Sequence, residues 1–167
     1  DARGNRTEVI RFDHRVLAPV EMADANGNHT EASLDILGRV IAIAAKGKSA
    51  SDGWEGDDLG AFRADASLRN PSTADVQNFC TASVLDEAQA RRWLSRASSR
   101  FVYHFGEARS ADGTVTVWAT RPAMACAIAR EVHASQPGGA TSPLQVALEC
   151  SDGTGNVLMK KVQAEPE

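Results

Sequence analysis

Alternation between apolar and polar residues constrains the fold of this chain more than any other feature. From residue 29 to residue 36, Ala32, Leu34 and Ile36 lie on one side of an extended chain, and polar side chains lie on the other. This is the period of a half-buried β-strand. The run VIAIAA at 40–45 is apolar on both sides, as in a strand with both faces covered. Because Gly38 lies between the two runs, they predict a β-hairpin.

The period of two recurs later in the chain. Residues 101–105 alternate in the same way, and the turn SADG separates them from TVTVWA at 114–119, which predicts a second hairpin. MACAIAREV at 124–132 predicts a further strand, and the turn SDGTG at 151–155 lies inside a third hairpin. We therefore expect an α+β fold that is mainly β, with about eight strands in antiparallel hairpins.

Two short helices are expected between about residues 72 and 98. Ser72 stands three residues before Asp75, which is the spacing of a capping box. A second helix begins at Ser83 or Asp86 and carries one apolar stripe. The residues of this stripe are Ala90, Trp93, Leu94 and Ala97.

The residues before these helices have a different composition. Positions 46–70 are rich in Gly, Ser and Asp, which predicts a long surface loop. We expect one strand-rich segment, 1–167, with a loop and helices inserted at about 46–98.

Charge and hydropathy exclude two classes of partner. The net charge is -4, and no cluster of Lys and Arg is longer than a pair, so we expect no binding to nucleic acid. The apolar runs at 40–45 and 123–129 are far shorter than the roughly 20 residues that span a bilayer, so we expect no membrane span. Cys80, Cys126 and Cys150 are widely spaced and predict buried free thiols. No cofactor motif is present.

A short turn motif occurs twice. Asp35–Val40 and Asp152–Val157 share the frame D-x-x-G-[RN]-V, and Asn26-Gly27-Asn28 supplies a further turn before the first copy. An EF-hand calcium loop that starts at Asp24 fails, because His29 stands where Gly is needed. The expected turn residues are Asp24, Asn26, Gly27, Asn28, Asp35, Gly38, Arg39, Asp152, Gly153 and Gly155.

Three groups of side chains could carry chemistry or binding. Glu131 and His133 share a face of a predicted strand and, with Tyr103 and His104, could form an acid/base site, or else a polar cluster that sets strand register. The acidic residues Asp52, Glu55, Asp57 and Asp58 could hold a metal ion or form a solvated loop. An exposed cluster around Trp54 and Trp118 would favour binding of carbohydrate or a receptor.

The turn motifs resemble those of YD-repeat (Rhs-type) proteins, whose units are strand, turn and strand. Together with other motifs in the same order, they resemble the C-terminal part of the B component of insecticidal toxin complexes and of related SpvB/TcdB-like proteins. The matching blocks are Val16–Pro19, Asp24 with Asn26–Asn28, Asp35–Gly38, Val102-Tyr103, Ala129–Glu131 with His133, Asp152–Gly155 and Lys161–Pro166.

The resemblance covers nearly the whole chain and implies a fragment of a much larger secreted or cell-surface protein. In that family the B component and a C component form a shell of β-strands that encloses a cytotoxic effector and docks on a pore-forming translocator. The resemblance therefore implies a non-catalytic wall segment whose partners are the rest of its own protein, the effector and the translocator. It carries no catalytic residue onto this chain.

Overall fold

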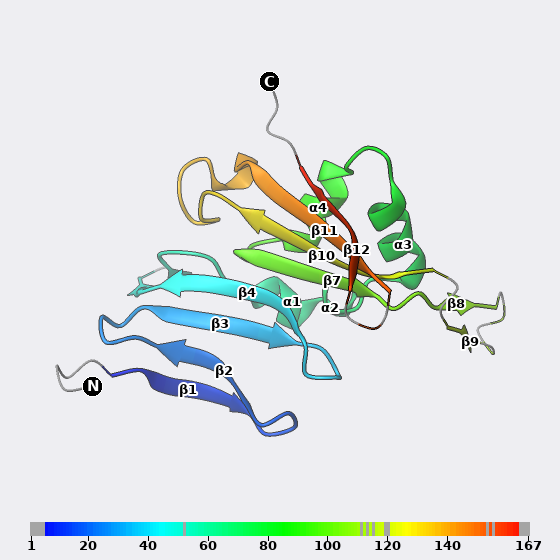
Figure 1. Cartoon of the computed structure of the whole chain (residues 1–167). Coiled ribbons are helices and arrows are strands. Elements are labelled where there is room, and N and C mark those ends of the chain that lie inside the picture. The colour runs from blue at the N-terminus through cyan, green and yellow to red at the C-terminus, as the bar shows by residue number, and fades with distance from the viewer. Residues whose placement is uncertain are drawn as a thin grey trace.

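The computed structural model describes residues 6–51, 53–110, 112, 114, 116–118, 121–152, 154 and 156–163. Eight strands form one antiparallel sheet in the order β1-β2-β3-β4-β7-β10-β11-β12 (Figure 1). The strands are β1 (Glu8–Asp13), β2 (Ala18–Ala23), β3 (His29–Leu34), β4 (Val40–Gly47), β7 (Ser99–His104), β10 (Ala123–Arg130), β11 (Leu144–Ser151) and β12 (Val157–Val162). Neighbours in the sheet follow one another in chain order, so the sheet is a meander. The mainly β prediction is confirmed.

The pairing of β7 differs from the prediction. β7 pairs with β10, not with the residues that follow the SADG turn. Of those residues, Thr116–Val117 form β9, which pairs with β8 (Ala108–Arg109) in a separate small sheet. The physical reason is burial: β10 places Met124, Cys126 and Ile128 in the core, whereas Val117 is 53% exposed.

The segment between β4 and β7 holds four helices where two were expected. The expected pair corresponds to α3 (Thr73–Thr81) and α4 (Glu87–Leu94). The additional helices are α1 (Gly60–Ala64) and α2 (Ala66–Arg69), within the predicted loop, which also forms the short strands β5 (Ser49–Ala50) and β6 (Gly53–Trp54). The prediction of a loop was wrong there because α1 and α2 each bury one large side chain, Phe62 or Leu68.

The core lies between the helices and one face of the sheet, while the opposite face carries no helix (Figure 1). On β7, Arg100, Val102 and His104 are buried toward the helices, and the residues between them are only partly buried. This second face, called the open face below, carries Tyr103 and small residues such as Ala127. All three cysteines are free and buried, as predicted. None of the described helices has the length and apolar character needed to cross a membrane.

Candidate functional site

Three hairpin turns share one pattern of hydrogen bonds. In each turn an aspartate Oδ1 accepts from the backbone N–H groups two and four residues later. Asp35 accepts from Leu37 and Arg39, both at 2.9 Å. Asp24 accepts in the same way from residues 26 and 28, and Asp152 accepts from residues 154 and 156. Each aspartate therefore supplies the acceptor that closes its own turn.

The residue four positions after each aspartate completes the turn. Its side chain donates to Oδ2 of the aspartate, from Asn28 at 2.9 Å, Arg39 at 2.8 Å and Asn156 at 2.9 Å. Residues 24–28 are thus a third copy of the frame D-x-x-G-[RN], although only a turn was predicted there. Reading that frame from the first aspartate would have found this copy.

The carboxylates of these three turns are engaged in hydrogen bonds within their own turns. Side-chain hydrogen bonds from Asn28 and Asn156 hold the pKa values of Asp24 and Asp152 below the usual range of aspartate. The glycine of the frame has positive φ where it is described, +78° at Gly27 and +80° at Gly38. The expected turn residues Gly153 and Gly155 lie outside the described residues.

The predicted acid/base residues do not share one site. Tyr103 and His104 are consecutive in β7, so their side chains point to opposite faces of the sheet. Tyr103 donates to the backbone oxygen of Val40, and His104 is buried beneath the helices. Glu131 accepts from Gln145 instead of bonding to His133. Glu131 and His133 do not share a strand face, because β10 ends at Arg130, before either residue.

His133 instead pairs with Asp57, which the sequence placed in the acidic loop. Nδ1 of His133 lies 2.8 Å from Oδ2 of Asp57, and the backbone N–H of Ala134 donates to Oδ1 at 2.6 Å. Ser98 Oγ also donates to Oδ2, at 2.5 Å. Since a carboxylate only accepts, the Nδ1 atom carries the proton of the His133 imidazole.

This pair has the geometry of a general base held by an orienting carboxylate. Asp57 is fully buried, while 42% of the His133 side chain is exposed. Nε2 of His133 is therefore the ring atom available to accept a proton. The Ser98 hydroxyl is fixed in position, because its Oγ also accepts from the backbone N–H of Ala45 at 2.8 Å.

A cavity of about 330 Å³ is lined by arginines and by Ala134, the residue after His133, but neither His133 nor Asp57 lines it. Arg130 donates to the backbone oxygens of Ala97, Gly139 and Ser95. Arg96 donates to Asp58 at 2.5 Å. Arg130 thus connects the end of α4 to the sheet and to the loop after β10, and Arg96 connects it to the segment before α1.

The acidic loop residues separate in the structure. Asp57 lies in the core, Asp58 accepts from Arg96 and from the N–H of Gly60, and Glu55 accepts from the N–H of Lys48. The fourth residue, Asp52, lies outside the described residues. Within the described part of the chain, no group of three or more His, Cys, Asp or Glu side chains could hold a metal ion.

The two tryptophans do not have a common environment. Trp54 contacts the His29 ring, and the Lys46 ammonium lies 3.8 Å from the Trp54 ring centroid. Trp118 follows β9 and is 64% exposed. Trp54 therefore contributes to the packing of β6 on the sheet.

The two edges of the sheet carry exposed apolar side chains. β1 pairs with β2 only and β12 with β11 only, so each has one edge without a partner strand in the described residues. Val9 and Ile10 on β1 are 51% and 47% exposed, and Leu158 and Val162 on β12 are 60% and 64% exposed. Such edges are templates for pairing with further strands.

The fold and its surface define a class of protein, namely an open antiparallel meander with helices on one face and, among the residues described, no partner strand at either edge. No family model matches the chain, and no curated protein matches it in sequence. The resemblance to toxin-complex B components, which was inferred from the turn frame and the order of the motifs, stays a prediction.

Proposed function

We propose that the chain is a non-catalytic structural segment of a toxin-complex B-like or Rhs-like protein. Its sheet contributes to a β shell that encapsulates a cytotoxic effector and delivers it through a pore-forming translocator. The partners are the remainder of the same protein, the C component with its effector, and the translocator. The place of action is outside the producing cell or on its surface.

The observation that carries this proposal is the exposure of both edge strands of the meander. A sheet that ends in Val9 and Ile10 on one side and Leu158 and Val162 on the other has apolar surface and backbone groups ready for two more strands. The aspartate turns reverse the chain between β2 and β3, between β3 and β4, and between β11 and β12, as neighbouring strands of such a wall require. A continuous wall therefore follows when preceding and following segments pair with β1 and β12.

Amide hydrogen exchange tests this proposal. The 167-residue chain is compared with the product of the full reading frame that encodes it. We expect the amides of β1 and β12 to exchange at least tenfold more slowly in the larger protein, because added strands protect them. The central strands β4, β7 and β10 serve as the internal control and should exchange alike. Equal exchange at the edges in both proteins, or a frame without further YD-type units, would contradict the proposal.

Hydrolysis is the second candidate function, and the Asp57–His133 pair favours it. A general base of this kind accelerates proton transfer by about 10²–10⁴-fold. The test is hydrolysis of p-nitrophenyl acetate by the wild-type chain, His133→Ala and the control His14→Ala. A loss of rate confined to His133→Ala supports the candidate, and equal rates in all three proteins remove it.

A further inference from the structure

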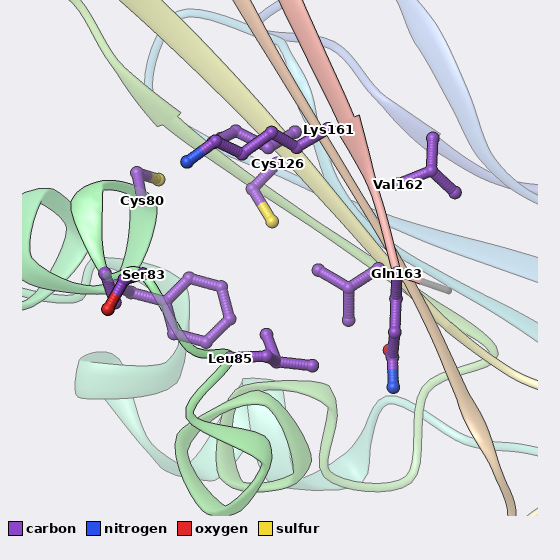
Figure 2. A pocket seen from close by; sticks show the side chains of 11 residues that line it. Cys80, Ser83, Leu85, Cys126, Lys161, Val162 and Gln163 are labelled. Carbon is purple, nitrogen blue, oxygen red and sulfur yellow. The ribbon is translucent and has the colours of Figure 1, made fainter. Parts of the chain in front are cut away.

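A cavity of about 340 Å³ lies between α3, the segment after it and the strands β10, β11 and β12 (Figure 2). Its walls are mainly apolar and include Phe79, Leu85, Val146 and Leu148, while Ser83 and Gln163 add polar groups. Its volume falls at the lower end of the about 300–1,000 Å³ that small-molecule pockets occupy. The cavity thus has the size and lining of a site for a small apolar ligand.

One cationic side chain, that of Lys161, lines this cavity. Lys161 pairs with Leu148 across β12 and β11, on the helix-facing side, and its side chain extends toward Cys80 (Figure 2). No carboxylate among the described residues lies within salt-bridge distance of Lys161. The adjacent Lys160 lies on the open face and pairs with Glu149 at 2.9 Å. Lys161 is therefore a positive charge available to a ligand in the cavity.

Two thiols form part of the apolar wall. Burial raises the pKa of Cys80 to about 11 and that of Cys126 to about 12, so both are neutral near pH 7. A neutral buried thiol behaves as a small apolar group and is a poor nucleophile. The cavity is suited to reversible binding.

We propose that this cavity binds a medium-chain aliphatic carboxylate. The acyl chain lies against Phe79, Leu85 and Val146, and the carboxylate pairs with the Lys161 ammonium. Both parts are needed, since apolar burial supplies most of the affinity and the single cation selects an anionic head group. This inference is independent of the proposed shell function.

Calorimetric titration of the 167-residue chain with decanoate, decanol and decylamine tests the head group. We expect decanoate to bind at least tenfold more tightly than decanol, and decylamine to bind most weakly. Octanoate should bind roughly tenfold more weakly than decanoate, because two fewer methylenes are buried. Equal affinity for decanoate and decylamine would overturn the proposal, as would no detectable binding of decanoate.

A matched pair of variants locates the site. Lys161→Met should reduce decanoate affinity at least tenfold, to that of decanol, whereas Lys160→Met on the opposite face should leave it unchanged. Val146→Phe should fill the cavity and abolish binding. If that variant does not fold, Ser83→Trp at the same cavity replaces it. Amide shifts induced by decanoate should cluster at β11, β12 and α3, and shifts confined to the open face would overturn the assignment.

Discussion

Asp35 illustrates how one side chain determines a turn in this protein. Its carboxylate accepts from Leu37 and Arg39 backbone N–H groups and from the Arg39 side chain, so three donors are satisfied at once. The same arrangement around Asp24 and Asp152 shows that local chemistry, not tertiary context, produces it. The sequence frame D-x-x-G-[RN] therefore folds into the same turn at each of its three positions.

The glycine of the frame permits a direct test at Gly38. A Cβ there would meet Val16 Cγ1 at 2.8 Å, whereas a Cβ at Gly27 would have nothing within 4 Å. Both residues have positive φ, but only Gly38 lacks space for a Cβ. Gly27→Ala therefore measures only the backbone strain of alanine at positive φ, about 1 kcal/mol of unfolding free energy. We expect Gly38→Ala to cost about 2–3 kcal/mol because a steric clash is added. Urea unfolding measures both, and equal losses would contradict this account of Gly38.

Asp35 also predicts how stability depends on pH. Burial opposes its ionisation, but hydrogen bonds from Arg39 and Leu37 outweigh burial and lower its pKa from the ordinary value of 3.8. The contribution of Asp35 is therefore present above about pH 4 and is lost as the pH falls through the lowered pKa. We expect the free energy of unfolding to decrease less between pH 5 and pH 2 in Asp35→Ala than in the wild type. Identical pH profiles would refute this.

At the scale of elements, charged side chains attach the helical insertion to the sheet. Glu31 on β3 is 2% exposed and pairs with Arg63 of α1 and with Lys46 of β4. Arg100 on β7 donates to the backbone oxygens of Ile41 and Leu68 at 2.8 and 2.7 Å. Burial lowers the pKa of Arg100 to about 10, and the group stays protonated at neutral pH. These contacts join α1 and α2 to particular strands.

Asp57 makes a corresponding connection between the helical insertion and the loop after β10. Asp57→Ala would leave the half-buried Ala134 N–H and Ser98 hydroxyl without their charged acceptor, so we expect a loss of about 3 kcal/mol in unfolding free energy. The matched control is Asp58→Ala, which removes a more exposed ion pair with Arg96 and should cost about 1 kcal/mol. Chemical denaturation distinguishes them. Similar losses at both positions would show that Asp57 does not anchor the loop after β10.

At the scale of the whole molecule, the two edge strands govern association. We expect the isolated chain to self-associate through β1 and β12, and the double variant Ile10→Lys/Leu158→Lys to weaken association at least tenfold. The control is Leu37→Lys, which changes an equally apolar side chain, 69% exposed, in a turn and away from both edges. Sedimentation velocity over a range of concentrations measures the effect. Equal association of the two variants would show that the edges are not the contact.

The sequence predicted the elements whose signals are local. The hairpin of β3 and β4, the hairpin of β11 and β12, and the capped helices α3 and α4 all follow from short periods and from turn or cap residues. The helices α1 and α2 were missed because each is too short for a period to show. Phe62 and Leu68 stabilise these helices by packing in the core, among residues that are distant in the sequence.

By itself the sequence determined the mainly β class, the turns after β3 and β11 and the burial of the three thiols, because these depend on neighbours a few residues apart. Only the tertiary structure decided that β7 pairs with β10, that Asp57 rather than Glu131 bonds to His133, and that Lys161 faces an apolar cavity. The Asp57–His133 contact joins residues 76 positions apart, and the cavity brings Lys161 of β12 near Cys80 of α3. Such contacts arise because strands pair wherever the most apolar surface is buried, and no local pattern specifies that choice.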